Sequence, residues 1–186
     1  MRIIAGRFKG VRLASPRNRG VRPTADRVRE ALFSTLGQAV EGARVLDLFA
    51  GTGALGFEAL SRGARFATFV DKDRRAIELL HKNVELLRVT NQVRMLNLNA
   101  SAALKKLAEE GEEFTMIFVD PPYGSDWIGK VACDPALLRI LETSGLLVIE
   151  TQSGNTPQVA SQFKKTFSRK YGGTLVEIFH LGSESI

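Results

Sequence analysis

A tetrad, Asp120-Pro121-Pro122-Tyr123, carries the most specific chemistry in this sequence. It follows the apolar run 115–119, which is typical of a buried strand. Two consecutive prolines remove two backbone donors and restrict the turn, so a carboxylate, a fixed carbonyl and an aromatic ring converge at the end of that strand. Open α/β sheets bind ligands at the carboxyl ends of their strands. The group suits an enzyme acting on a flat, amine-bearing base, and a dinucleotide dehydrogenase has no need of it.

A glycine turn forms the second candidate site. The apolar residues of 45–49 lead into Gly51-x-Gly53-x-x-Gly56 and then into an apolar-periodic segment, which predicts a strand, a tight turn and a helix start. Such a turn lets backbone approach a ligand closely, and the helix N-terminus offers unpaired N–H groups. Several nucleotide-type cofactors use this pattern and a turn without any ligand can share it, so the glycines alone identify no cofactor.

A carboxylate at the end of the next predicted strand sharpens this interpretation. Asp71 follows the strand 66–70 and lies 20 residues after Gly51. An acid there can accept hydrogen bonds from ribose hydroxyls when an adenosine lies across the strand ends. The alternative is an ordinary N-cap, because Asp71 or Asp73 could start the helix expected over 74–87. The spacing suits a βαβ unit and favours ligand binding.

The elements that must position these residues alternate along the chain. We expect strands near 44–48, 66–70, 93–98, 115–119 and 145–150, with helices near 54–62, 73–88, 101–109 and 134–142 between them. This alternation predicts a parallel sheet with helices on both faces. The segments 163–168 and 174–179 predict a terminal β-hairpin.

The N-terminal residues predict a basic appendage. Residues 2–4 and 11–13 predict a short β-hairpin, and Thr24 is a good N-cap for a helix that ends near Gly37. The first 30 residues carry a net charge of +7, whereas the whole chain carries +6, so the remainder is nearly neutral. A positive arm on a near-neutral body is typical of a phosphate-binding surface. A solvated, partly disordered N-terminus is the alternative.

Composition excludes several other classes of protein. The 186 residues are 44% hydrophobic and 25% charged, as expected for one globular α/β domain with an appendage. There is neither an apolar run of membrane-spanning length nor a signal-peptide core, so we expect a cytoplasmic protein with no membrane partner. The single cysteine, Cys133, cannot form an internal disulfide and is expected to pack in the core. No spacing typical of a metal site occurs.

The motifs resemble those of a known enzyme family. Asp120-Pro121-Pro122-Tyr123 resembles the (D/N/S)PP(Y/F/W) signature of S-adenosylmethionine-dependent amino-methyltransferases, and 47–53 looks like their cofactor loop. Segments 1–10, 22–24, 29–33 and 53–64 are similar to the bacterial family that methylates a guanine N2 of small-subunit ribosomal RNA (RsmD type). The similarity covers nearly the whole chain and weakens after about residue 155.

This resemblance implies a fold and a division of the chain. It implies a Rossmann-like class I methyltransferase fold, an α/β architecture whose mostly parallel, seven-stranded sheet has the order 3-2-1-4-5-7-6, with an N-terminal basic β-hairpin and helix. Residues 1–38 would form this appendage and 39–186 the methyltransferase domain. The implied cofactor is S-adenosylmethionine, and the implied partner is ribosomal RNA or the small ribosomal subunit, bound by a monomer without a metal.

The resemblance also assigns candidate site residues. The residues expected to bind the cofactor are Asp47, Phe49, Ala50, Gly51, Thr52, Gly53, Asp71, Lys72, Asn99 and Ala100. The residues expected to bind the RNA are Arg2, Arg7, Lys9, Arg12, Arg22, Thr24 and Pro122. Related enzymes often have aspartate where this chain has Asn99, although the amide oxygen can still accept from an adenine amino group.

Asp120, Pro121 and Tyr123 are the expected catalytic residues. The Asp120 carboxylate and the Pro121 carbonyl would accept from the N–H groups of the target amine, stabilise the positive charge that develops there and aim it at the methyl group. Tyr123 would stack on an unpaired or flipped base. Individually, Asp120 could be a cap or turn residue and Tyr123 a half-buried aromatic, while Trp127 could line the base pocket or pack in the core.

Three functions remain open at this point. The first is a guanine-N2 methyltransferase of small-subunit ribosomal RNA. The second is a DNA adenine-N6 or cytosine-N4 methyltransferase, which would share the tetrad, although the chain leaves little room for a separate DNA-reading domain. The third is an RNA-binding module that keeps the fold without catalysis. The tetrad does not distinguish RNA from DNA, and the N-terminal segments favour the RNA enzyme.

Overall fold

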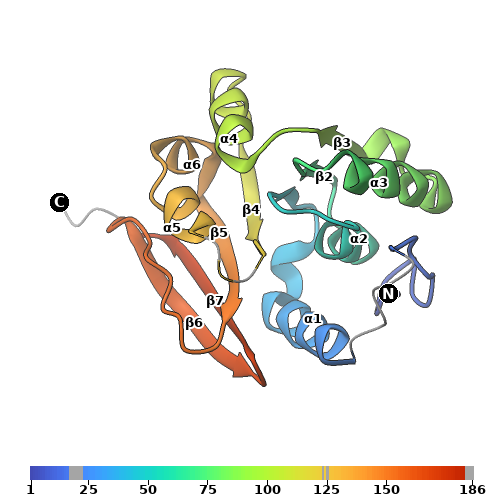
Figure 1. Cartoon of the computed structure of the whole chain (residues 1–186), viewed down its shortest axis with the longest axis horizontal. Helices are drawn as coiled ribbons and strands as arrows, with labels where there is room; N and C mark the ends of the chain where they lie inside the picture. Colours follow the sequence, from blue (N-terminus) through green and yellow to red (C-terminus); the bar gives the residue numbers. More distant parts are fainter. Residues whose placement is uncertain (17–22, 123, 125, 183–186) are drawn as a thin grey trace.

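A single mixed sheet runs through the part of the chain that the computed structural model describes, residues 1–16, 23–122, 124 and 126–182 (Figure 1). Its seven strands have the order β3-β2-β1-β4-β5-β7-β6, which confirms the predicted fold class. The strands are β1 (Arg44–Asp47), β2 (Phe66–Val70), β3 (Val93–Leu96), β4 (Phe114–Val119), β5 (Leu141–Gln152), β6 (Phe163–Tyr171) and β7 (Thr174–Leu181). β1 to β5 pair in parallel, and β7 is antiparallel to both β5 and β6.

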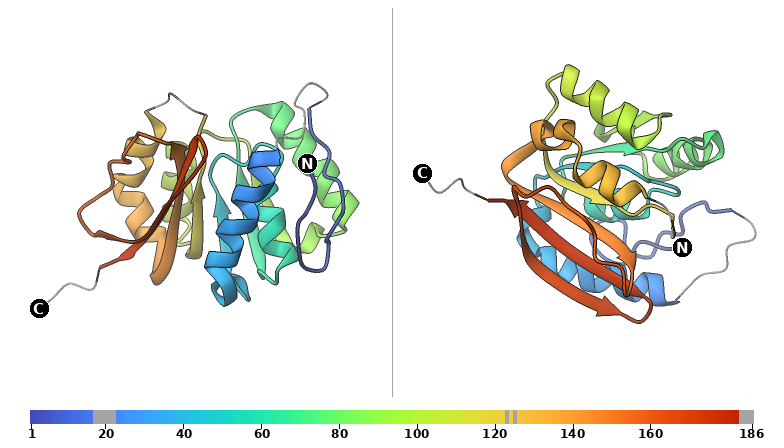
Figure 2. Two further views of the ribbon diagram at one scale, coloured as in Figure 1. Left: turned by 90° about the horizontal axis from the view of Figure 1, so that it is seen from below. Right: turned by 60° about the vertical axis from the view of Figure 1, so that its left-hand side comes forward.

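Helices cover both faces of the sheet, as a parallel sheet requires (Figures 1 and 2). One face packs against α1 (Pro23–Leu36), α2 (Ala54–Ser61) and α3 (Arg74–Leu87). The other packs against α4 (Ala100–Glu109), α5 (Trp127–Ala132) and α6 (Pro135–Ile140). Two short 3-10 turns, η1 (Gly37–Val40) and η2 (Thr90–Gln92), complete the described elements. None of the described helices combines the length and the apolar character needed to cross a membrane.

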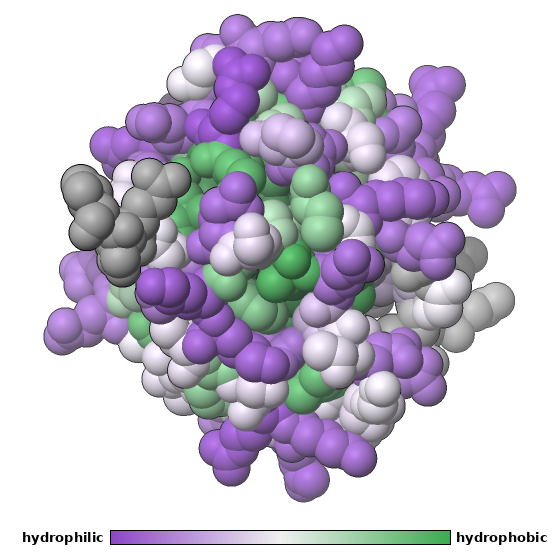
Figure 3. Space-filling view, turned by 90° about the vertical axis from the view of Figure 1, so that its left-hand side faces the viewer, coloured by the Kyte–Doolittle hydropathy of each residue, from purple (hydrophilic) through white to green (hydrophobic). Residues whose placement is uncertain are grey.

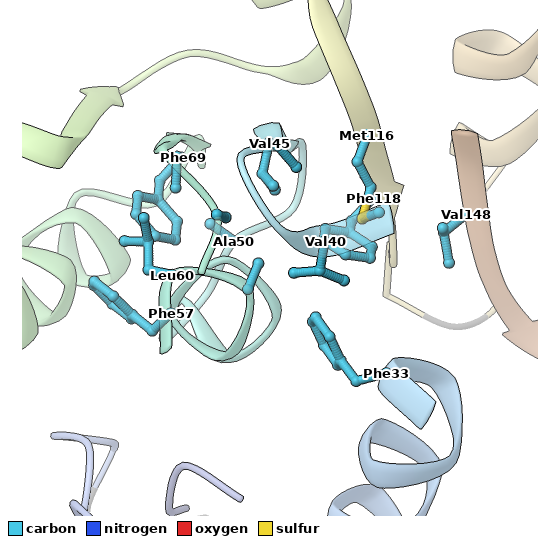
Figure 4. Close-up of a cluster of buried hydrophobic side chains, with 14 of the residues drawn as sticks. Phe33, Val40, Val45, Ala50, Phe57, Leu60, Phe69, Met116, Phe118 and Val148 are labelled. Atoms are coloured by element: carbon cyan, nitrogen blue, oxygen red, sulfur yellow. The ribbon is translucent and has the colours of Figure 1, made fainter. Parts of the chain in front are cut away.

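Aromatic side chains fix α1 and α2 on the sheet (Figure 4). Phe33 of α1 points toward Phe118 of β4, with ring centroids 5.9 Å apart. Phe57 of α2 lies against Phe69 of β2, with centroids 4.6 Å apart. All four rings are fully buried. Because truncating a buried phenylalanine costs about 3–5 kcal/mol, the first pair strongly stabilises α1 on β4 and the second α2 on β2.

The opposite face carries α5, α6 and the segment that leads into β6. Figure 3 shows apolar surface gathered near the middle of this face, with hydrophilic side chains around it. Several partly buried apolar residues pack here on the second core: Ile128, Ala136, Leu138, Val159 and Ala160. Among the described residues, the one large apolar side chain that is classed as exposed is Leu86 on α3, away from this face.

The segment between β4 and β5 differs from the sequence prediction. Instead of one helix near 134–142, α6 ends at Ile140 and β5 already begins at Leu141, while α5 was not predicted. Asp134 caps α6 by accepting from the amide of Ala136 at 2.9 Å. Leu141 pairs with Phe114 and Leu146 with Met116, so an irregularity in β5 absorbs the extra residues.

The basic N-terminal arm, residues 1–16, folds back on itself with a single antiparallel bridge between Arg2 and Arg12. The amide of Ile3 donates to the carbonyl of Val11 at 3.0 Å, so the predicted hairpin is present as a short bridge rather than as two strands. α1 begins at Pro23, which places Thr24 inside its first turn and corrects the prediction that Thr24 precedes the helix. The domain boundary after residue 38 stays a prediction.

Candidate functional site

The glycine loop after β1 is held by backbone hydrogen bonds to both neighbouring strands. The amide of Leu48 donates to the carbonyl of Phe118 at 3.1 Å, and the amide of Ala50 donates to that of Val70 at 3.0 Å. Gly53 has a φ of 80°, and a Cβ there would lie 2.4 Å from the Phe57 ring. Only glycine fits this position, so the loop has a fixed shape at the carboxyl end of the sheet.

Asp71 faces this loop from the end of β2. Its Oδ2 accepts from the amide of Gly51 at 2.8 Å, and its Oδ1 accepts from the amide of Asp73 at 2.9 Å. The N-cap of α3 is Asp73, whose carboxylate accepts from the amide of Arg75 at 2.9 Å. The helix-cap alternative therefore applies to Asp73, and Asp71 is left beside the glycine loop with Lys72 exposed next to it.

Asp47, at the end of β1, is a buried acid with one unused oxygen. It is 2% exposed, and its Oδ2 accepts from the amide of Gly56 at 3.2 Å. Its Oδ1 is buried and has no hydrogen-bond partner within the described residues. Burial raises the pKa of Asp47 to about 7, although the Gly56 amide opposes this shift. A buried acceptor without a partner suits a positively charged group of a ligand.

Two predicted cofactor residues lie at the start of α4. Asn99 is the N-cap of this helix, and its side-chain oxygen accepts from the amide of Ala102 at 2.9 Å. Ala100 is the first helical residue and is buried. Phe49 packs against Trp127 with ring centroids 6.0 Å apart, so Trp127 supports the loop after β1 by packing. A contact between Asn99 and an adenine stays a prediction.

Asp120 directly follows β4 and stands beside a second acid. Because Val119 pairs with Ile149 in parallel, the next residues along the two strands, Asp120 and Glu150, are neighbours at the carboxyl edge of the sheet. Burial raises the pKa of Asp120 to about 6. Burial, and then the charge of Asp120, raise the pKa of Glu150 to about 8, while Arg29 acts in the opposite direction.

A groove of about 750 Å³, which is within the range of ligand sites, opens beside the two prolines of the tetrad. Pro121, Pro122 and Glu150 line it on the side of the sheet, and Lys130 and Cys133 of the α5 region line it opposite. Cys133 is exposed here, which corrects the prediction that it packs in the core. Tyr123 lies outside the described residues.

The cations of the arm that were predicted to contact RNA are on the surface. Arg2, Arg7, Lys9 and Arg12 are all exposed. The Arg7 guanidinium lies 4.5 Å from the centroid of the Phe8 ring and donates to the Gln92 side chain. Arg22 and the side chain of Thr24 lie outside the described residues, so the structure does not place them relative to the tetrad.

A buried asparagine that the sequence did not single out connects this arm to the glycine loop. Asn83 of α3 accepts from the amide of Ala14 at 2.6 Å, and its amide group donates to the carbonyls of Ala14 and Thr52. Glu58 of α2, also buried, accepts from the amides of Ile4 and Ala5. The arm is thus fixed on the two helices that flank the loop.

The described residues contain no group of three or more His, Cys, Asp or Glu side chains that could hold a metal ion. The site brings together carboxylates, backbone groups and, on the arm, surface cations. Together they can hold a nucleotide-like ligand at the glycine loop and present a second ligand to Asp120 and Pro121 from the groove.

Comparisons with known proteins agree with this arrangement. A family model described as Conserved hypothetical protein 95 matches residues 1–180. Ribosomal RNA small subunit methyltransferase D of Escherichia coli (strain K12) is 41% identical over 150 residues, which span 81% of this chain and 71% of that protein.

Two solved structures share the fold over almost their whole length. That of yhhF from Escherichia coli, described as a methyltransferase, has a TM-score of 0.85 and 33% identity, with 99% of each chain covered. The hypothetical protein TTHA0928 of Thermus thermophilus has a TM-score of 0.80 and 31% identity, with 97% of this chain and 99% of that chain covered.

Proposed function

Because the chain belongs to the RsmD-type family of small-subunit ribosomal RNA methyltransferases, we propose that it transfers a methyl group from S-adenosylmethionine to the exocyclic N2 of a guanine in that RNA. One observation carries the proposal: Asp120 directly follows β4 at the carboxyl edge of the sheet, where the fixed glycine loop also lies, and the adjoining Pro121 borders a groove. Acting on ribosomal RNA, such an enzyme would be cytoplasmic, and we propose that it acts as a monomer.

The residues of the glycine loop fit the proposed cofactor. Asp71 would accept from the ribose hydroxyls while it keeps its bond to Gly51, because each carboxylate oxygen has a second lone pair. The unused Oδ1 of Asp47 would accept from the ammonium of the methionine part. Asn99 and Ala100 would lie against the adenine, and Phe49, Ala50, Thr52, Gly53 and Lys72 would complete the contacts. When bound, the cofactor supplies a methyl group activated by a sulfonium.

Asp120 and Pro121 would prepare the amine for transfer. The lone pair of a guanine amine is delocalised into the base, so the nitrogen is a weak nucleophile. Two hydrogen bonds from the N–H groups of the amine, one to the Asp120 carboxylate and one to the Pro121 carbonyl, would orient the nitrogen and favour its pyramidal form. The Asp120 carboxylate would stabilise the positive charge that the amine nitrogen gains as it accepts the methyl group.

The nitrogen must then lose a proton. With a pKa of about 6, Asp120 is mostly ionised at neutral pH, and it can accept this proton directly or leave it to water. Tyr123 would stack on the flipped base, and such stacking stabilises a bound base by about 1–3 kcal/mol. Pro122 would border the base.

The N-terminal arm would contribute affinity for RNA rather than catalysis. Its exposed cations would contact phosphates, and its fixed attachment through Asn83 and Glu58 would keep them in one place relative to the glycine loop. Arg22 and Thr24 would extend this surface toward the substrate mouth.

A transfer assay with methyl-labelled cofactor tests the proposal. Extracted small-subunit RNA, assembled small subunits and plasmid DNA are offered separately to the purified protein. We expect label in one or both of the RNA samples and none in the DNA. Label in DNA alone would favour the amino-methyltransferase of DNA bases, and cofactor binding without transfer to any sample would favour a binding module without catalysis.

A further inference from the structure

Glu150 carries a carboxyl group in the part of the site that would bind the nucleobase, and the proposed mechanism gives it no role. It borders the same groove as Pro121 and Pro122, and it follows Ile149, whose partner Val119 directly precedes Asp120. No hydrogen bond to the carboxyl of either Asp120 or Glu150 is formed by the described part of the chain. Within the described residues, no protein donor therefore competes with a ligand for these two neighbouring, partly buried acids.

Guanine presents three groups in a row along one edge: the O6 acceptor, the N1–H donor and the N2 amine. If the amine binds Asp120 and Pro121 on β4, the remaining two groups extend from β4 along the edge of the sheet. Neighbouring strands are about 4.8 Å apart, so a side chain at the end of β5 lies within reach of them. Glu150 occupies this position.

We propose that Glu150 is a specificity-determining residue whose carboxyl group binds the O6 and N1–H edge of the target guanine. This inference rests on the proposed function, because it takes the N2 amine to be the methylated group. A carboxylic acid offers one acceptor and one donor in the same plane, and guanine offers the matching donor and acceptor. The contact would separate guanine from bases that carry an amine but lack this pair of groups.

The charges around Glu150 favour the protonated form that this contact needs. Burial and the neighbouring Asp120 raise its pKa to about 8, against the effect of Arg29 from α1. The groove also contains Asp126 and Lys130, both exposed. On β7 its paired neighbour is the uncharged Val176.

The two acids would therefore differ in charge at neutral pH. With pKa values of about 6 and about 8, Asp120 is ionised and accepts from the amine, while Glu150 keeps its proton and donates to O6. Different environments commonly give two neighbouring carboxyl groups different roles in this way. Above its pKa an ionised Glu150 would repel O6, so binding of guanine should weaken.

Paired variants and a base analogue test the proposal. Glu150→Gln keeps one acceptor and one donor without titrating, whereas Glu150→Leu keeps the volume and loses both. The substrate is small-subunit RNA in which the modified guanosine is either retained or replaced by 2-aminopurine, which has the amine but neither O6 nor N1–H. Relative kcat/KM for the two RNAs is measured near neutral pH and at about pH 9, about one unit above the pKa of Glu150.

We expect the wild type and Glu150→Gln to prefer guanine at neutral pH, and Glu150→Leu to lose about 10–100-fold of this preference. Activity on guanine should decline in alkaline solution for the wild type and persist for Glu150→Gln. Glu109→Gln, which neutralises an exposed acid at the end of α4 outside the groove, is the matched control and should behave as the wild type.

Equal preference for guanine in Glu150→Leu and the wild type would overturn the proposal. So would an alkaline decline that is unchanged in Glu150→Gln, and this outcome decides the matter even if Glu150→Leu fails to fold. Cofactor affinity and melting temperature report whether each variant is folded. Absence of any transfer to guanine by the wild type would instead contradict the proposed function itself.

Discussion

The carboxylates at the two halves of the carboxyl edge of the sheet differ in their hydrogen bonds to backbone amides. On the side of β1 and β2, Asp71 accepts from the amides of Gly51 and Asp73, and Asp47 accepts from that of Gly56. On the side of β4 and β5, the carboxyl groups of Asp120 and Glu150 accept no such hydrogen bonds from the described residues, and their pKa values are raised, as is that of Asp47. Asp71 and Asp47 thus fix the glycine loop through hydrogen bonds to its amides, whereas the carboxyl groups of Asp120 and Glu150 fix no loop in this way.

This difference suits the β1–β2 side to binding of the cofactor and the β4–β5 side to methyl transfer. Acids that already accept hydrogen bonds from the backbone fix a loop, and they lose little conformational freedom when a cofactor binds. Partly buried acids without partners are costly to the fold, and they interact strongly with a ligand that supplies the missing bonds. Asp47 combines both features, because one of its oxygens is bonded and the other is not. Variants on the two sides should therefore fail in different ways.

The largest effect is expected for Asp120→Ala. Removing the carboxylate leaves the developing charge on the amine without a partner, so kcat should fall on the order of 10³-fold. Cofactor affinity, measured by calorimetry, should stay within about threefold because the glycine loop is untouched. Glu109→Ala, which removes an exposed acid at the end of α4 outside the groove, should retain wild-type turnover. If Asp120→Ala turned over near the wild-type rate, the assignment of methyl transfer to the β4–β5 side would be wrong.

Asp71→Ala should show the opposite pattern. Losing the ribose acceptor and the bond to Gly51 should weaken cofactor binding by about 10–100-fold, while kcat at saturating cofactor falls much less. The matched control is Asp73→Ala, which removes the N-cap of α3 and should cost about 1 kcal/mol of stability with cofactor affinity retained. If both variants lose affinity equally, the ribose role of Asp71 is wrong.

Neutralising the arm should affect RNA binding alone. Four exposed cations are changed to glutamine: Arg2, Arg7, Lys9 and Arg12. Each phosphate contact that is lost should reduce the slope of log affinity against log salt by about 0.7–0.9, and affinity near physiological salt should fall about tenfold. Filter binding of small-subunit RNA across a salt series measures both quantities.

The control for the arm removes the same charge elsewhere. It changes four exposed cations of α3 and α4 to glutamine: Arg75, Lys82, Lys105 and Lys106. An arm that binds phosphates predicts a smaller salt slope for the arm variant than for this control. Identical slopes would show that only the net charge of the protein matters.

The smallest effect is a pH dependence that comes from Asp47. Its pKa is raised to about 7, so the carboxylate that would bind the cofactor ammonium is present above this pH and is lost as pH falls through it. Cofactor affinity should fall about three- to tenfold between about pH 7.5 and about pH 6. Asp47→Asn should bind more weakly and with a flat profile. The same decline in Asp47→Asn would assign the titration to another group.

The sequence predicted the sheet and most of its edge because these features are local. Apolar runs ending in Asp47, Asp71 and Asp120 place each acid at the end of a strand, and the motifs fix the strand order through resemblance. Glu150 lies two residues before the end of β5 and belongs to none of the recognised motifs, so the sequence did not single it out.

Features that depend on contacts between distant segments could not be predicted. Which of Asp71 and Asp73 caps α3 depends on where the Gly51 amide lies. The early start of β5 depends on its pairing with Phe114. The role of Asn83 requires Ala14 and Thr52, far apart in the sequence, to meet at α3.

Mass mapping of the methylated nucleoside tests the central claim most directly. Small-subunit RNA treated with the purified protein and isotopically labelled S-adenosylmethionine is digested, and the labelled nucleoside is identified and located. We predict N2-methylguanosine at a defined position, and none when Asp120→Ala replaces the wild type. Label in any other nucleoside, or label that persists in Asp120→Ala, would contradict a guanine amine held by Asp120 and Pro121.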